Sequence, residues 1–170
     1  MSGQNKNQDA KSPGKMKRLF ISTTILILLL IPQLAFSSDL DEFKDAVEKH
    51  YQAYNSMDAD TIVEMEYPWT VMIESNVPFP QVYPTPEASR EALQNWFSTL
   101  ESLNFFSIDR QYKVVGNTGI VWGFGGSRIK RKDGSVDIRY SRETHTWVKS
   151  GGKWRILTTH LSKFPLDDLK

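Results

Sequence analysis

The first regular pattern of apolar and polar positions lies between residues 39 and 57, where apolar side chains recur at the spacing of one helix face. These apolar positions are Leu40, Phe43, Val47, Tyr51 and Tyr54. Acidic residues stand at the amino end of the segment, where the helix dipole favours negative charge. The pattern predicts a first helix over residues 39–57.

A short helix and a short strand are predicted next. The helix covers residues 62–65, with Asp58 or Asp60 as its cap and Pro68 beyond its end. The strand covers residues 69–73, which are apolar and rich in strand-forming side chains.

A proline-rich loop and a third helix follow. Residues 76–86 contain several prolines, which lack the amide proton that a continuous strand ladder needs. The third helix begins at Pro86 or Glu87, since proline suits the first turn of a helix. Its apolar side consists of Ala88, Ala92, Leu93, Trp96, Phe97 and Leu100.

From residue 105 to residue 165 the pattern changes to long runs of strand-forming residues separated by turns. The turns are expected at residues 116–117, 132–134 and 150–152. They predict a four-stranded antiparallel meander whose long strands must bend to stay packed on a small core. Three glycines between residues 123 and 126 lie inside the second of these strands, where glycine permits a bend or a bulge.

Helices followed by a long meander predict an α+β domain, with the N-terminal helices packed in a strongly curved antiparallel sheet. A sheet that wraps around helices leaves a cavity at its open end. The expected shape is a cone with a pocket, and the chain length allows one such domain, over residues 38–170.

The first 37 residues have the order of a secretory signal peptide. A polar, basic segment precedes an apolar run at 19–31, which is shorter than the roughly 20 residues that span a bilayer comfortably. The small residues Ala35 and Ser37 then mark a cleavage site before Ser38. Because Met16 is followed at once by Lys-Arg and the apolar run, it is the favoured true start of the chain.

The expected destination is the periplasm or the extracellular space, with no stable membrane anchor after cleavage; the alternative is an uncleaved signal anchor that tethers the protein. Without residues 1–37 the chain has 16 Lys+Arg and 19 Asp+Glu, a net charge of −3. This mildly acidic balance argues against nucleic acid as a partner. The sequence contains no cysteine, so the core alone must hold the exported domain.

The end of the chain carries Arg142-x-Thr144, a turn at Gly152-Lys-Trp154, and His160-x-Ser162. This hairpin resembles the closing hairpin of the nuclear transport factor 2-like superfamily, in its SnoaL-like members and in the calcium/calmodulin-dependent kinase association domain branch. The resemblance extends through element order and size over residues 39–165. It implies the cone fold, and because the superfamily includes ketosteroid isomerase-like enzymes, cyclases, dehydratases and transport factors, the fold alone names no function.

Strand alternation supplies the candidate ligand-binding residues. Trp154 and Ile156 suit the core, so His160, on the same strand face, is expected to face the pocket. Arg142 is expected to follow its apolar strand neighbours inward in the same way. An arginine and a histidine in an apolar pocket suit an anionic or polar group. The candidate set is Arg142, His160, Ser162, Tyr140, Thr144, Tyr54 and Trp122.

Each of these residues also has a structural interpretation. Arg142 would then pair with an acidic residue, His160 would be a structural histidine, and the aromatic residues would belong to the core. No metal site is predicted, because Glu143 and His145 lack a third ligand and face away from the expected cavity. No cofactor is expected either.

Three classes of function remain open. The leading interpretation is a protein that binds an apolar small molecule with a polar or anionic group. An isomerase, cyclase or dehydratase would instead move a proton, with His160 as the catalytic candidate or with a carboxylate. The carboxylates available are Asp109, Glu66 and Glu74.

The third class is an interaction module that works through the outer face of the sheet. Apolar residues are expected on that face of the last strands, at Trp147, Leu157 and Leu161. A second copy of the chain covering them would give a homodimer, and the alternative is coverage by the domain's own terminal segment.

Overall fold

The computed structural model describes residues 38–74 and 77–164. The predicted signal peptide over residues 1–37 lies outside these described residues, so cleavage and export stay predictions. The described residues from Asp39 onward form one compact unit. No helix in the described part is long and apolar enough to cross a membrane.

Helices come first along the described chain and long strands come last, as the sequence predicts. The helices are α2 (Ser38–Asn55), α3 (Ala59–Glu64) and α4 (Pro86–Ser98). The strands are β1 (Glu66–Glu74), β2 (Gln81–Val82), β3 (Leu100–Val115), β4 (Thr118–Arg131), β5 (Val136–Ser150) and β6 (Lys153–Lys163). Strand β3 begins earlier than predicted, directly after α4.

Side-chain caps fix where two of the helices begin. Asp58 accepts a hydrogen bond from the Thr61 amide at 3.0 Å and so caps α3. Thr85 caps α4 by accepting from the Ala88 amide at 3.2 Å, and Pro86 occupies the first turn. Of the two caps predicted for the second helix, Asp58 is therefore the one used.

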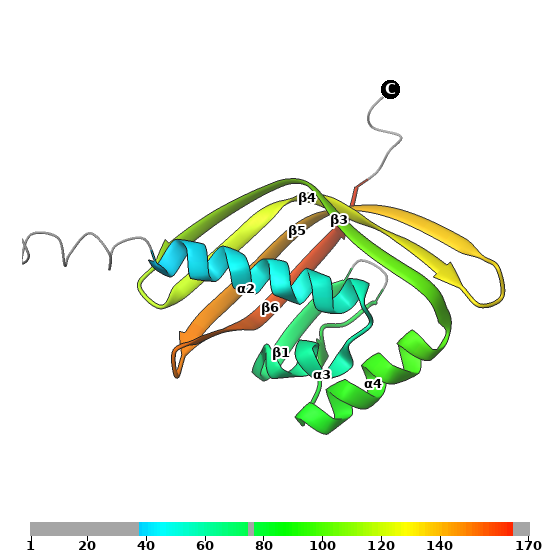
Figure 1. Ribbon diagram of the computed structural model, residues 1–170, viewed down its shortest axis with the longest axis horizontal. Coiled ribbons are helices and arrows are strands. Elements are labelled where there is room, and N and C mark those ends of the chain that lie inside the picture. Colours follow the sequence, from blue (N-terminus) through cyan, green and yellow to red (C-terminus); the bar gives the residue numbers. More distant parts are fainter. Residues whose placement is uncertain (1–37, 75–76, 165–170) are drawn as a thin grey trace, which may run out of the picture. The chain divides into compact units, whose positions relative to one another are not determined.

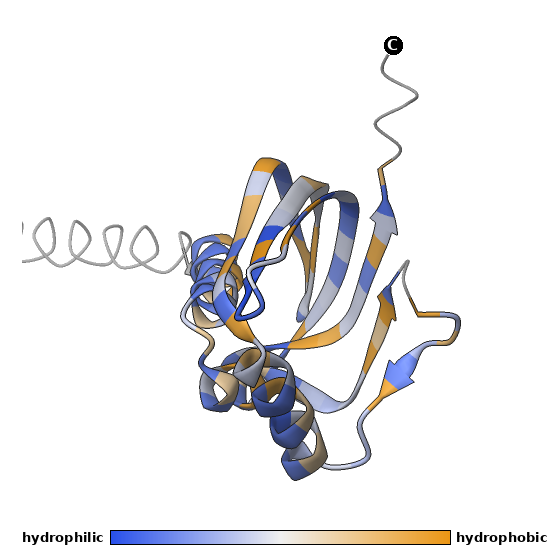
Figure 2. Cartoon of the chain, turned by 90° about the vertical axis from the view of Figure 1, so that its right-hand side faces the viewer, coloured by the Kyte–Doolittle hydropathy of each residue, from blue (hydrophilic) through white to orange (hydrophobic). Residues whose placement is uncertain are grey.

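The six strands form one sheet in the order β2-β1-β6-β5-β4-β3. Strands β3 to β6 are the predicted antiparallel meander, and β1 joins it beside β6 in parallel orientation. The sheet is curled and unclosed, and the helices lie on one side of it (Figures 1 and 2). The predicted α+β class, with N-terminal helices packed in a curved sheet, is confirmed.

An extra residue in β3 helps to bend the sheet. Ser107 and Asp109 pair with neighbouring residues of β4, so Ile108 is left without a partner. Gly123 of β4 lies close to this point, and a Cβ atom there would lie 1.9 Å from the carbonyl oxygen of Asp109. Only glycine allows the two backbones to approach so closely.

Two buried clusters form the core between the helices and the sheet. The first consists of Phe43, Val47, Met65, Val121, Trp147, Trp154 and Ile156. The second consists of Ala53, Ala59, Ile62, Val63, Leu93, Phe97, Leu100, Leu103 and Ile129. Helix α2 contributes to both clusters, so its position fixes how the sheet and the other helices meet.

We predict that Gly123→Ala destabilises the domain by about 1–3 kcal/mol or more, because the new methyl group overlaps the Asp109 carbonyl oxygen. Urea denaturation followed by circular dichroism measures this loss. Thr144→Ala, an exposed change on the adjacent strand, is the control and should alter the unfolding free energy by no more than about 0.5 kcal/mol. Equal stability of the two variants would contradict the close contact between β3 and β4.

Candidate functional site

The face of β5 that points into the domain is the opposite of the one predicted. Glu143, His145 and Trp147 are buried, whereas Arg142 and Thr144 are exposed on the outer face. The prediction assumed that the apolar residues at the start of β5, Val136 and Ile138, point into the core. This end of β5 extends past α2, and both side chains are exposed (Figure 1).

A bulge in β6 overturns the prediction for His160. The pairing register between β5 and β6 shifts at Leu157, which is an extra residue in β6. An extra residue moves every later side chain to the opposite face. Thr159 therefore faces inward, whereas His160 is exposed and Ser162 lies on the outer face opposite Arg142 in the β5–β6 register.

The remaining predicted ligand residues divide between the two faces. Trp122 is 41% exposed on the outer face. Tyr140 lies on the same face, since it is two residues from Arg142 in a regular part of β5. Tyr54 alone is inside, where its ring packs edge-on against Phe97. The predicted set therefore does not come together as one site.

The prediction for the outer apolar face is also wrong in its main residue. Trp147 is 1% exposed and belongs to the core. Leu157 is the half-buried bulge residue, and Leu161, which pairs with the inward-facing Glu143 beyond the bulge, is half-buried on the inner face. Because Trp147 is larger than the apolar residues at the start of β5, its need for burial decides which face of the strand points inward.

Inside the domain, four polar side chains form a group that we call the Glu143 network: Tyr51, Arg110, Glu143 and His145. The Tyr51 hydroxyl donates to Glu143 Oε2 at 2.5 Å and lies 3.0 Å from His145 Nε2. Arg110 Nε donates to Glu143 Oε1 at 3.2 Å, and the guanidinium lies 3.9 Å from the centre of the Tyr51 ring. The network joins α2 to β3 and β5.

The hydrogen bonds of the Glu143 network have one consistent proton arrangement. Tyrosine has a single hydroxyl proton, and in this arrangement Tyr51 donates it to Glu143. His145 must then donate from Nε2 to the Tyr51 oxygen. The other ring nitrogen of His145, Nδ1, lies 3.2 Å from the Thr159 hydroxyl, which orients the imidazole.

Burial by itself would raise the pKa of Glu143, but the hydrogen bonds from His145 and Tyr51 and the attraction of His145 and Arg110 lower this pKa to about 2. Glu143 is therefore a stable carboxylate at neutral pH. His50, which precedes Tyr51 on α2, packs edge-on against Trp147. Burial, followed by repulsion from His145 and Arg110, lowers the pKa of His50 to about 3, so its ring is neutral.

A second group of polar side chains lies toward β1, and we call it the carboxyl–phenol cluster: Tyr54, Glu66, Glu74 and Tyr83. Burial, and then the negative charges of Glu66, Glu74 and Tyr83, raise the pKa of the Tyr54 hydroxyl. The pKa of Tyr83 is raised by burial and by the same two glutamates. Two phenols and two carboxyls from α2, β1 and the segment before α4 therefore share one electrostatic environment.

The pKa values of the two carboxyls in this cluster shift in the opposite direction from that of Glu143. Burial raises the pKa of Glu66, and the Ser89 hydroxyl offsets this only in part. Burial also raises the pKa of Glu74, against a weaker opposing attraction from Arg139. Neither carboxyl forms an ion pair with another described residue. Their raised pKa values make these two carboxyls stronger proton acceptors than Glu143, whose pKa is lowered.

The matching family model is that of the SnoaL-like domain, over residues 44–167. The chain belongs to the SnoaL-like domain family. No curated protein matches it. Within the described residues of this SnoaL-like domain, no group of three or more histidine, aspartate or glutamate side chains is placed to hold a metal ion.

Solved structures share the fold at low sequence identity. A nuclear transport factor 2-like protein from Salmonella enterica serovar Typhimurium is 18% identical, with a TM-score of 0.63, and the match covers 74% of this chain and 90% of that one. A ketosteroid isomerase-like protein from Erwinia carotovora atroseptica is 17% identical, with a TM-score of 0.62 and coverage of 76% and 99%.

A protein from Xanthomonas campestris, provisionally named a calcium/calmodulin-dependent protein kinase II association domain, is 15% identical. Its TM-score is 0.62, and the match covers 74% of this chain and 87% of that one. The family model and these shared folds together confirm the resemblance that the closing hairpin of the SnoaL-like domain suggested. At such identities they show the fold and leave the activity open.

Sequence reasoning missed most of the interior polar residues. The sequence predicts Tyr51 on the apolar stripe of the first helix and as an aromatic residue that could line the pocket, and nothing in it marks Arg110. The spacing Glu143-x-His145-x-Trp147 was a usable signal, because a buried tryptophan would have placed the other two inside. Glu66 and Glu74 were named as possible bases, but nothing in the sequence shows that they share surroundings with Tyr54.

We predict that Glu143→Gln destabilises the SnoaL-like domain at pH 7 by about 3–5 kcal/mol, because the buried Arg110 side chain keeps only its longer contact with the exposed Glu48, at 3.8 Å. The folded-state pKa of Glu143 is depressed, so its contribution to stability is present above about pH 4.5 and is lost as the pH falls toward 2. Urea denaturation from pH 7 to pH 3 should show a flatter acid limb in the variant.

Glu101→Gln is the control for this experiment, since Glu101 forms an exposed ion pair with Lys130 at 2.6 Å. Its unfolding free energy should stay within about 1 kcal/mol of the wild type. If Glu143→Gln behaved like this control at every pH, the Glu143 network would not be what holds α2 on the sheet.

Proposed function

We propose that this protein binds a small molecule through the carboxyl–phenol cluster. The observation that carries the proposal is that Glu66 and Glu74 are half-buried, lack ion-pair partners among the described residues, and lie close enough to Tyr54 and Tyr83 to raise the pKa of both phenols. Buried polar groups without partners destabilise a domain unless something satisfies them. A ligand group that donates to the carboxyls or accepts from the phenols would do so.

The cluster favours a neutral polar group on the ligand rather than an anion. The anionic group expected from the sequence depended on Arg142, which lies on the outer face. An anion would be repelled by Glu66 and Glu74 whenever they are ionised. A ketone or hydroxyl on an apolar ring system fits two phenol donors beside two carboxyls, with aromatic residues such as Trp96 and Phe105 nearby.

An enzyme of the isomerase or dehydratase class is the second candidate function. The raised pKa values of Glu66 and Glu74 favour it, because a carboxylate whose pKa is raised is a stronger base and so suits general acid–base catalysis better than an ordinary surface carboxylate. The phenols of Tyr54 and Tyr83 would stabilise an oxyanion that develops on a substrate carbonyl. The ketosteroid isomerase-like structural relative is consistent with this class through its fold alone.

Homodimerisation through the outer face of the sheet also belongs to the proposal. That face carries exposed apolar side chains on adjacent strands, and a second copy would cover them. These side chains include Ile120, Trp122, Phe124, Val136 and Ile138. The proposed dimer interface is therefore formed by β4 and the start of β5, and it does not include Trp147.

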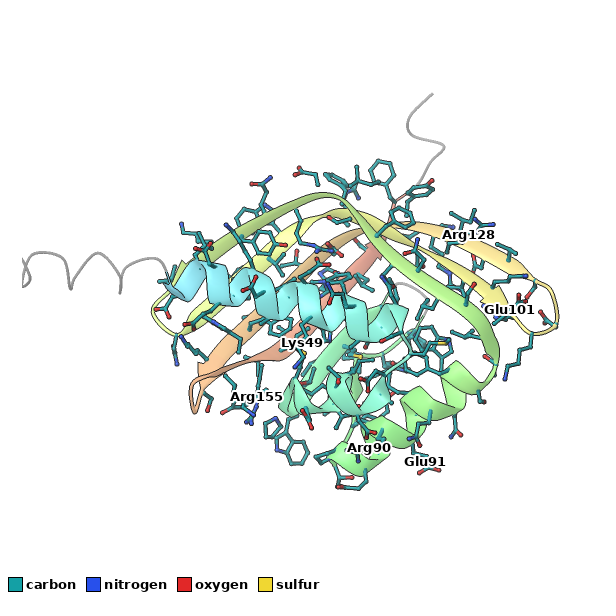
Figure 3. All side chains as sticks on the ribbon, in the orientation of Figure 1. Lys49, Arg90, Glu91, Glu101, Arg128 and Arg155 are labelled. Carbon is teal, nitrogen blue, oxygen red and sulfur yellow. The ribbon has the colours of Figure 1, made fainter. Side chains whose placement is uncertain are left out.

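We predict that α-tetralone, a flat aromatic ketone, binds the wild-type protein and that Glu74→Gln weakens this binding about ten-fold, since a hydrogen-bonding partner is altered. An NMR titration measures the affinity, and deuterium exchange of the ketone's α-protons in D₂O measures proton transfer in the same sample. Glu91→Gln, an exposed change on α4, is the matched control and should leave both unchanged (Figure 3).

The two readouts separate the candidate functions. Binding without accelerated exchange supports a binding protein, and exchange that is lost in Glu74→Gln supports an enzyme. Neither binding nor exchange in the wild type, or binding that is insensitive to Glu74, would contradict the proposed site.

For the dimer, we expect sedimentation velocity to give a dimer for the wild type and a monomer for Trp122→Lys, since a charge would be buried in the interface. Phe79→Lys, which changes a 76% exposed residue in the loop before β2, should remain dimeric. A monomeric wild type would contradict the proposed homodimer.

A further inference from the structure

Strand β1 contains an insertion where it runs beside β6. Glu66 pairs with Ile156, and the next pair along the ladder is Val71 with Thr158. Residues 67–70 therefore loop out opposite a single residue of β6. Irregular pairing of this kind redirects side chains, and such bulges are frequent beside functional sites.

The insertion is held in a strained conformation. The Thr70 hydroxyl lies 2.7 Å from the carbonyl oxygen of Tyr67 and 2.8 Å from that of Ile156, which pins the loop to β6. Trp69 has a φ of 67°, in the left-handed region that large side chains rarely adopt. Its indole is 67% exposed. Strained backbone clusters at functional sites, so a strained residue that exposes a large aromatic side chain is a candidate ligand contact.

The insertion lines a cleft of about 580 Å³. Segment 83–86, which leads into α4, contributes to the lining, and so does Arg90 of that helix. Lys153 and Arg155 of β6 line it as well. Arg90 and Arg155 lie in the lower part of the domain as drawn, and Arg128 lies far from both (Figure 3).

Arg155 is a cation of this cleft that lacks a partner. Its Nε atom is buried, yet it makes no hydrogen bond to any group in the described part of the chain. Lys153 likewise has no ion pair with a described residue. Arg90, in contrast, is bound to Asp60 at 2.6 Å. Arg155 as a whole is half-buried, so the rest of its guanidinium can take an acceptor from water or a ligand in the cleft.

The acidic residues of the cleft do not cancel this positive charge. Glu64 and Glu66 line it, but neither forms an ion pair with Arg155 or Lys153. Burial favours the neutral form of Glu66 by raising its pKa. The unpaired cations therefore leave a site that attracts an acceptor group with negative charge.

We propose that the cleft binds an aromatic carboxylate, with the carboxylate on Arg155 and Lys153 and the ring against Trp69. A guanidinium presents parallel N–H donors that match the two oxygens of a carboxylate, and a lysine adds charge without fixed geometry. An exposed indole offers a flat apolar surface for the ring. The cleft overlaps the carboxyl–phenol cluster at Glu66 and Tyr83, but the residues that would hold the carboxylate and the ring, namely Arg155, Lys153 and Trp69, line only the cleft.

The test is an NMR titration of ¹⁵N-labelled protein with 2-naphthoate and with its neutral analogue 2-naphthamide. We expect naphthoate to bind at least about ten-fold more tightly, as the loss of a charge-assisted hydrogen bond implies. Naphthoate should shift the Trp69 indole signal, which is assigned by its absence in Trp69→Phe. Arg155→Gln should remove the preference for naphthoate, whereas Arg155→Lys should keep part of it.

Arg128→Gln is the matched control, because it removes an exposed arginine of β4 that does not line the cleft. It should leave the preference for naphthoate unchanged. Glu74→Gln should do the same, since Glu74 belongs to the other site, and this separates failure of the cleft from failure of the proposed function.

Three results would overturn the assignment. They are equal affinity for the two probes, an unchanged preference in Arg155→Gln, and loss of naphthoate binding in Glu74→Gln. The last would show that the carboxylate enters the carboxyl–phenol cluster instead.

Discussion

The fold depends on one buried carboxylate, that of Glu143 on β5, which must be hydrogen bonded and paired with a cation. Glu143 is 5% exposed, so it requires both a cation and a hydrogen-bond donor. Arg110 of β3 and Tyr51 of α2 meet this need together. Because hydrogen bonds are directional, they allow few positions of α2 on the sheet. Fixing Tyr51 also places Tyr54, one turn further along the helix, where it faces the glutamates of β1.

Local signals in the sequence were enough to predict the elements. Helical spacing and the three glycine-containing turns act over a few residues and are predicted correctly, and the structure uses Asp58 and Pro86 out of the two alternatives that the sequence left at each of these helix starts. The curved α+β class follows from their order. What the sequence could not show is where strand alternation breaks, because the extra residues Ile108 and Leu157 look like any other strand residue.

The candidate site shows the same division. Tyr54 could be predicted from the helical stripe, and Glu66 and Glu74 are recognisable as carboxyls near the first strand. Their raised pKa values depend on burial, which arises from packing between segments that are distant in the sequence. His160 and Ser162 were assigned to the pocket by alternation that a single bulge reverses. The sequence thus shows which chemical groups are present, but it does not show which face of the sheet their side chains point to.

The extra residue in β3 has a consequence beyond curvature. Among the described strands β3 forms one edge of an open sheet, and a long, flat edge invites pairing with strands of other molecules. The bulge at Ile108 interrupts the regular spacing of the free amide and carbonyl groups along this edge. Charged residues follow at Asp109, Arg110 and Lys113. A foreign strand therefore meets two short stretches instead of one continuous ladder, which protects the folded domain from edge-to-edge aggregation.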